Sequence, residues 1–141
     1  MSTRSNIGIL NSDKSVNLIY CHWDGYPSHN GKILLKHYTT TAKVRALLKL
    51  GDISSLAPEI GFKHDFDNHS DEIVTAYGRD RGEKGTKARK YMSTTVMFQQ
   101  IEDSWTEYLY LWDVKHNKWL FAPLDGRPVL RTLTQKDCRR D

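Results

Sequence analysis

The sequence has little of what marks a secreted, membrane-spanning or fibrous protein. Only two of its 141 residues are cysteine and four are proline, so it has no disulfide framework and no proline-rich linker. No apolar run approaches the roughly 18 residues of a membrane span, and the first six residues lack the apolar core of a signal peptide. These absences predict a cytoplasmic protein in a reducing compartment, with no membrane partner.

The composition that is present indicates a globular domain. Hydrophobic residues make up 38% of the chain and include four tryptophans and seven tyrosines, which excludes a disordered tail. A chain of this length suits one domain with a core of its own. We therefore expect a single domain over residues 1–134 and a frayed polar tail over residues 135–141.

Alternating apolar residues predict two β-hairpins. Residues 5–23 read as two strands around a polar turn, with Tyr20 and His22 on the same face of the second strand. Residues 108–114 and 119–121 form the second hairpin, and residues 73–77 are a short strand that runs into a basic, glycine-containing loop.

Helical spacing predicts two or three helices. Residues 32–38 and 41–50 are the clearer cases, because a threonine triplet offers an N-cap to the second and Gly51 follows its end. Residues 93–101 fit a helix or a strand, and we favour the helix. The expected fold class is α+β, an antiparallel sheet with the helices packed on one face.

The charge is unevenly distributed although the net charge is only +4. Residues 59–72 contain five acids and one lysine, whereas residues 79–90 contain six bases and two acids. A basic block of this kind can attract an anionic partner, although it can equally be a solvated loop that its acidic neighbour covers. The wide scatter of the other basic residues gives nucleic acid only weak support as the partner.

The end of the first hairpin contains the densest group of candidate ligand-binding residues. His22, Trp23, Asp24 and Tyr26 combine an imidazole, a carboxylate and two aromatic rings within five residues. The rings can stack on a base. If the protein is an enzyme, His22 would be the general base and Asp24 would fix its tautomer. A packed strand end with a turn at Asp24 is the structural alternative.

A second candidate group lies at the start of the basic block. Tyr77, Arg79 and Arg81 are interspersed with glycines, which lets guanidinium groups and backbone amides approach an anion together. The spacing matches neither a P-loop nor a dinucleotide fingerprint. We expect this group and the one around His22 to line one pocket that takes a nucleotide.

Two further groups are interpreted as structural. Residues 64–69 contain two histidines and two aspartates, but their spacing fits neither zinc nor calcium, so we expect no metal and no cofactor. Cys21 lies inside a predicted strand and is interpreted as a small buried hydrophobe rather than a nucleophile.

Three segments resemble a family of small proteins met in phages and prophages. They are residues 1–9, the IYCHWDGYP run of residues 19–27 and the AYGRDRG run of residues 76–82. The family has no settled biochemical role, so it provides no catalytic residue. The resemblance implies an accessory protein that interferes with host machinery or host defence, an association rather than a physical argument.

These observations leave three functions open. The first is a non-enzymatic accessory protein that binds a host protein or a phosphorylated, nucleotide-like ligand. The second is a small enzyme that hydrolyses a nucleotide or phosphodiester. The third is a structural or regulatory protein-interaction domain, and self-association into a homo-oligomer is compatible with each of them.

Overall fold

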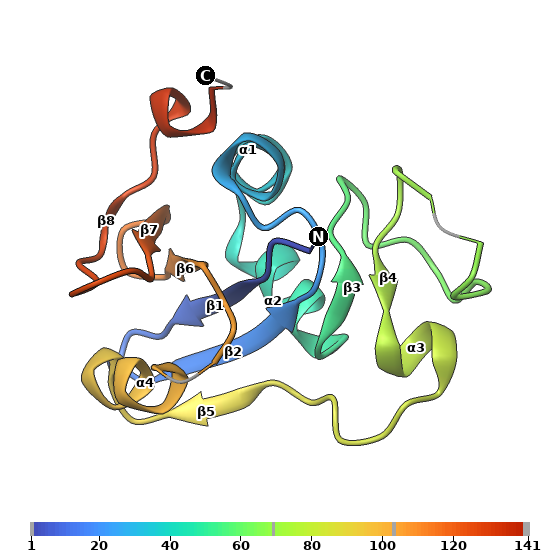
Figure 1. Cartoon of the computed structure of the whole chain (residues 1–141), viewed down its shortest axis with the longest axis horizontal. Helices are drawn as coiled ribbons and strands as arrows, with labels where there is room; N and C mark the ends of the chain where they lie inside the picture. The colour runs from blue at the N-terminus through green and yellow to red at the C-terminus, as the bar shows by residue number, and fades with distance from the viewer. Residues whose placement is uncertain (1, 69, 103, 140–141) are drawn as a thin grey trace.

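A computed structural model describes residues 2–68, 70–102 and 104–139 and shows an α+β fold, as the sequence predicted. These residues form a mixed sheet and four α-helices (Figure 1). The strands are β1 (Ser5–Leu10), β2 (Val16–Cys21), β3 (Ile53–Ser55), β4 (Thr75–Ala76), β5 (Arg89–Tyr91), β6 (Tyr108–Asp113), β7 (Lys118–Pro123) and β8 (Arg131–Thr132). The helices are α1 (Lys32–His37), α2 (Thr41–Lys49), α3 (Tyr77–Arg81) and α4 (Thr94–Ile101), with a π-helical turn η1 (Pro27–Gly31) and a 3-10 turn η2 (Gln135–Cys138).

The sheet is mixed rather than antiparallel. Its strands follow the order β4-β3-β2-β1-β6-β7-β8, and β5 pairs with β2 beside β3. Both expected hairpins are present, β1 with β2 and β6 with β7. The expectation of an antiparallel sheet is wrong because the two parallel pairs, β1 with β6 and β2 with β3, join segments distant in the sequence. Local hairpin patterns carry no information about such pairs.

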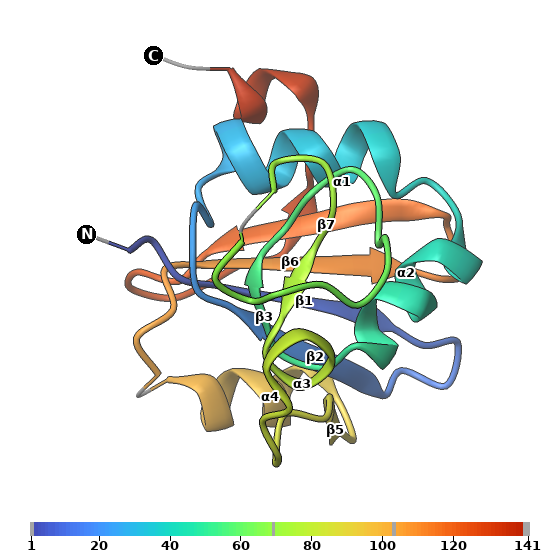
Figure 2. The same ribbon diagram turned by 90° about the vertical axis from the view of Figure 1, so that its right-hand side faces the viewer.

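Helices cover both faces of the sheet, whereas we expected one face. Side chains of α1 and α2 pack on the face that Ile7 and Ile9 present, and Met97 of α4 packs on the opposite face with Leu18 and Leu111. Figure 2 shows α1 above the sheet and α4 below it. The second face carries its own apolar stripe, which α4 removes from water.

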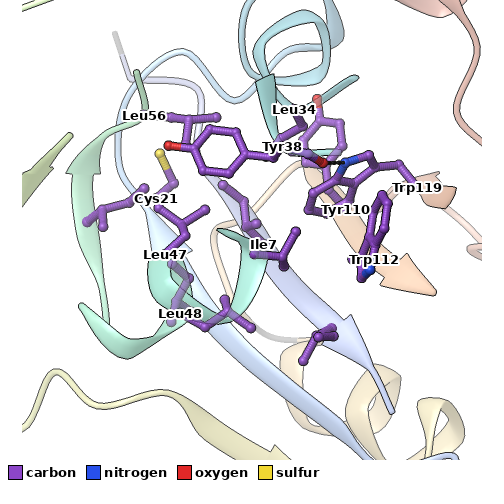
Figure 3. Close-up of a cluster of buried hydrophobic side chains, with 14 of the residues drawn as sticks. Ile7, Cys21, Leu34, Tyr38, Leu47, Leu48, Leu56, Tyr110, Trp112 and Trp119 are labelled. Atoms are coloured by element: carbon purple, nitrogen blue, oxygen red, sulfur yellow. Dashed lines mark hydrogen bonds between the residues drawn. The ribbon is translucent and has the colours of Figure 1, made fainter. Parts of the chain in front are cut away.

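The face under α1 and α2 is a closed core built around buried aromatic rings (Figure 3). Tyr38 and Tyr110 are fully buried, and each hydroxyl donates to a backbone carbonyl, of Ala57 at 2.8 Å and Gly25 at 2.6 Å. The indole of Trp119 donates to the Tyr38 carbonyl at 2.9 Å. The aromatic polar atoms on this face are thus satisfied inside the protein.

Three segments differ from the sequence-based expectation. The strand expected at residues 73–77 is reduced to Thr75–Ala76, and the loop expected after it begins with the short helix α3. The tail expected to fray forms η2, because Thr134 and Asp137 cap it and Cys138 is buried; residues 140–141 lie outside the described residues. Within the described ranges, no helix combines the length and apolar character that crossing a membrane requires.

Candidate ligand-binding groove

His22 follows β2 and interacts with Tyr20, not with Asp24. The Tyr20 hydroxyl lies 2.7 Å from His22 Nδ1, and the imidazole meets the edge of the Trp23 ring at 4.7 Å between centroids. No hydrogen bond or ion pair joins His22 to Asp24 among the described residues. The proposed arrangement of a histidine oriented by Asp24 is therefore replaced by one oriented by a tyrosine.

Asp24 begins the tight turn that leads from the sheet into η1. Its φ of +56° lies in the left-handed region, which non-glycine residues adopt rarely. The next residue, Gly25, passes so close to β1 that an added Cβ would lie 2.7 Å from the Cβ of Ser5. The Asp24 carboxylate accepts a hydrogen bond from Tyr26 at 3.1 Å. This turn separates Trp23 and Asp24, which line a depression of about 380 Å³, from Tyr26, which lines another cleft.

Arg79 holds part of the fold together. Its guanidinium donates to the Asp80 carboxylate at 2.9 Å, to the carbonyl of Ile60 at 2.7 Å and to that of Val74. The Asp80 side chain is fully buried and also accepts from the backbone of Ala76. Burial alone would raise the pKa of Asp80, but the hydrogen bonds from Arg79 and the backbone outweigh it and lower that pKa.

Arg81 stacks on aromatic rings near Trp23. Its guanidinium lies 4.4 Å from the ring centre of Phe66 and 4.9 Å from that of Tyr77, and it pairs with Glu83. Phe66 also lines the depression of Trp23 and Asp24. The structure therefore gathers Trp23, Asp24, Tyr77 and Arg81 around Phe66 at one corner. His22 and Tyr26 touch this corner through Trp23 and Asp24 but do not line its depression, and Arg79 does not line it either.

A groove between the sheet and α4 contains residues that sequence reasoning missed. It has a volume of about 460 Å³, and its lining residues come from β1, β2, β5, α4 and the segment after α4. Its lining includes two arginines, the amide of Asn6 and three aromatic rings; the arginines are Arg4 and Arg89, and the rings are those of Tyr20, Tyr91 and Trp105. Of these rings, Trp105 is 82% exposed. A cationic, aromatic groove of this size is within the usual range for a small-molecule site.

Two buried polar atoms of the groove residues have no partner within the described part of the chain. Asn6 is 8% exposed, and its amide nitrogen donates to the carbonyl of Ile19 at 3.3 Å, which leaves Oδ1 unpaired. The Nε of Arg4 is likewise buried and unpaired. Unpaired buried polar atoms cost about 1–3 kcal/mol each, and native proteins contain few. Both atoms are buried, so a ligand in the groove would reach this acceptor and this donor only after the two side chains shift.

The groove carries net positive charge. Arg89 forms a two-pronged ion pair with Asp52, at 2.9 and 3.0 Å, and the hydrogen bonds that it donates to Asp52 raise the pKa of Arg89. Asp52 also accepts from the backbone nitrogen of Tyr20, which fixes it at the groove wall. Arg4 forms no ion pair with any described carboxylate. The charge of Arg4 is therefore the one that a ligand can neutralise.

His22 lies beside this groove, one hydrogen bond beyond Tyr20. Partial burial, with a smaller contribution from the charge of Arg4, lowers the pKa of His22 below its ordinary value. The imidazole is therefore neutral near pH 7. Burial raises the pKa of Cys21 to about 11 and keeps its thiol protonated, in agreement with a structural role.

The predicted acidic loop is not organised around a metal in the described residues. His64 Nε2 lies 3.4 Å from Asp80 and 3.2 Å from the carbonyl of Val74, which ties it to the Arg79 cluster. Its predicted companion His69 lies outside the described residues. Among the residues that the structure describes, no group of three or more His, Cys, Asp or Glu side chains is suited to holding a metal ion.

Comparison with protein-family models, with curated proteins and with solved structures finds no match for this chain. The groove is therefore interpreted from its own geometry. The sequence does carry a signal for the part of the groove that β1 and β2 form. The turn at residues 11–15 sets the hairpin register that pairs Asn6 with Tyr20. The other part comes from β5 and from the segment after α4, which only the folded chain brings there.

Proposed function

We propose that the protein binds a phosphorylated, nucleotide-like ligand in the groove between the sheet and α4. The unpaired atoms of Arg4 and Asn6 carry this proposal, because a shift of the two side chains would open them to the groove and a ligand that presents a donor and an acceptor would then satisfy both. The edge of a nucleobase presents such a pair. Satisfying buried polar groups is a source of affinity and of specificity.

The other groove residues fit the remaining parts of a nucleotide. The guanidinium of Arg4 has no carboxylate partner among the described residues, so its charge is available to a phosphate. Tyr91 and Trp105 present aromatic faces on which a base can stack, each such contact being worth about 1–3 kcal/mol. A compact groove favours a mononucleotide over duplex DNA.

Calorimetric titration with the four common ribonucleoside monophosphates tests this function. We expect at least one to bind the wild-type protein and Arg4→Ala to weaken that binding about tenfold, the loss of one charge-assisted hydrogen bond. Arg127→Ala is the matched control, since it removes the same charge from an exposed position outside the groove. Absence of binding for all four, or equal losses in the two variants, would refute the proposal.

The enzyme alternative is decided by the same samples. A binding protein returns the nucleotide unchanged after incubation, whereas a hydrolase yields a product that chromatography detects. The neutral His22 beside Tyr20 is the candidate base for that reaction. His22→Ala would then abolish product formation while leaving nucleotide affinity close to that of the wild type.

The resemblance to phage accessory proteins gives this proposal a biological setting. A small protein that sequesters a nucleotide would withdraw it from a host response. A host protein is the alternative partner, and exposed side chains beside the groove, Met92 and Trp105, would then form the contact. In that case nucleotide titrations give no heat, and the Trp105→Ala variant loses the protein partner.

A further inference from the structure

A second and larger cleft lies on the other side of the sheet, between α1 and the C-terminal turn η2. It has a volume of about 950 Å³, and Figure 2 shows the two elements side by side. The approach is close because of Gly31, where an added Cβ would lie 3.3 Å from Cys138 Sγ. An ion pair between Arg131 and Asp137 at 2.8 Å holds η2 in place. The cleft walls are therefore structured on both sides.

The charged groups that line this cleft are all basic. Lys32 and Lys36 lie one turn apart on α1, Arg139 follows η2, and His29 belongs to η1; all four line the cleft. The lining contains no Asp or Glu. Within the described part of the chain, none of these lysine or arginine side chains forms an ion pair. Three unneutralised cations around one cavity repel each other, and an anion would relieve that repulsion.

A partly buried hydrogen bond to Asn30 fixes the orientation of His29. The Asn30 side chain is fully buried and donates to Ser5 Oγ at 3.3 Å and to Cys21 Sγ at 3.4 Å, which leaves its oxygen as an acceptor. That oxygen lies 2.9 Å from His29 Nδ1, so Nδ1 carries the hydrogen. Nε2 is then the ring nitrogen left for the cleft.

We propose that this cleft binds a small molecule that carries two or more phosphoryl groups. The site is distinct from the groove beside α4 and goes beyond the function proposed for it. Three cations from two elements match the charge of a linear oligophosphate better than that of orthophosphate. They surround one cavity and do not form the extended stripe that tracks a nucleic-acid backbone. Leu35 and Tyr26 add apolar wall for an organic substituent.

Titration calorimetry with orthophosphate, pyrophosphate and tripolyphosphate at constant ionic strength tests the proposal. We expect affinity to rise with each phosphoryl group. The double variant Lys32→Ala, Lys36→Ala should weaken tripolyphosphate binding about a hundredfold, about tenfold for each lost contact. Lys84→Ala, Lys87→Ala is the matched control, because it removes the same charge from exposed positions in the basic block; we expect it to bind within twofold of the wild type.

Three results would overturn the oligophosphate site. Equal losses in the two double variants would show that tripolyphosphate binds to net charge alone. Absence of tripolyphosphate binding to the wild type would remove the site altogether. A single-stranded oligonucleotide that displaces tripolyphosphate at lower concentration would favour a nucleic-acid site instead. Arg4→Ala should leave tripolyphosphate binding unchanged, so this cleft and the groove beside α4 can fail independently.

Discussion

Two arginines of this protein differ in how far the folded chain satisfies their hydrogen-bond donors. The guanidinium of Arg79 is saturated by Asp80 and by two backbone carbonyls, and it joins the segment around residue 60 to β4. Arg4 has a buried nitrogen with no partner in the described part of the chain and lines a groove. The first arginine lies in a glycine-containing motif typical of ligand-binding loops, whereas the second directly precedes β1, in a segment without any such motif.

The comparison shows that the motif is a weaker guide to function than the hydrogen bonds of the folded chain. A guanidinium that donates in several directions inside the protein has little left to offer a ligand. One that is desolvated and unpaired has already lost its water, so a ligand that binds it gains more. Substitutions around Arg79 should therefore change the stability of the fold, whereas substitutions around Arg4 should change ligand binding.

Asp80→Ala should lower the free energy of unfolding by about 3–5 kcal/mol, because it leaves the mostly buried guanidinium of Arg79 without its carboxylate. Urea denaturation measures the change. The control is Arg81→Ala, whose half-exposed ion pair with Glu83 should contribute less than about 1 kcal/mol. Similar losses in the two variants would mean that the Arg79 cluster does not stabilise the fold.

The contribution of Asp80 should disappear in acid. Its pKa is lowered in the folded protein, so below the ordinary value of 3.8 the unfolded chain binds more protons than the folded one. The difference in unfolding free energy between wild type and Asp80→Asn should be full near pH 7 and shrink as pH falls below that value. Denaturant titrations at a series of pH values measure it, and a constant difference would contradict the assignment.

Asn6→Ala should change stability by less than about 1 kcal/mol while weakening nucleotide binding about tenfold. The substitution loses one hydrogen bond to Ile19 but also removes an acceptor that has no partner, and these effects oppose each other. Urea denaturation and calorimetry measure the two quantities on one sample. A stability loss as large as that of Asp80→Ala would assign Asn6 a structural role instead.

The smallest expected effect is on the titration of His22. Its pKa should lie below 6.5 and should rise in Arg4→Ala, since the positive charge of Arg4 opposes protonation of the imidazole. Nuclear magnetic resonance of the imidazole signals across pH measures both values. Arg127→Ala should leave the pKa of His22 unchanged, and a shift of the same size in that variant would contradict a local effect of Arg4.

Elements with a local signal were predictable from the sequence. Both hairpins and the helix at Thr41–Lys49 follow their patterns, and the ambiguous segment at Thr94–Ile101 is the helix that we favoured, with Ser93 as its N-cap. The mixed pairing of the sheet and the second helical layer were not predictable, because both depend on which distant segments of the chain meet. Predicting that helices cover both faces requires knowing which strands form the whole sheet.

The candidate site was predictable only in part, for the same reason. The sequence placed Tyr20 and His22 on one face of a strand, and that face does line or border the groove. It could not reveal that the guanidinium of Arg79 donates to the backbone carbonyl of Ile60, 19 residues earlier in the chain, and so has few donors left for a ligand. Nor could it reveal that Trp105 lines the same groove as Asn6 of β1.

The position of β1 in the middle of the sheet has a consequence for how the chain is made. Its first neighbour, β2, follows at once, but its second neighbour, β6, begins only at residue 108 and is synthesised after most of the chain. Until then the hairpin presents an open strand edge that can pair with another nascent chain. Closing the sheet pairs residues 5–10 with residues 108–113, a non-local step that slows folding. The groove beside α4 can form only after that step, so a shortened chain that ends before β6 would have the first hairpin and no binding site.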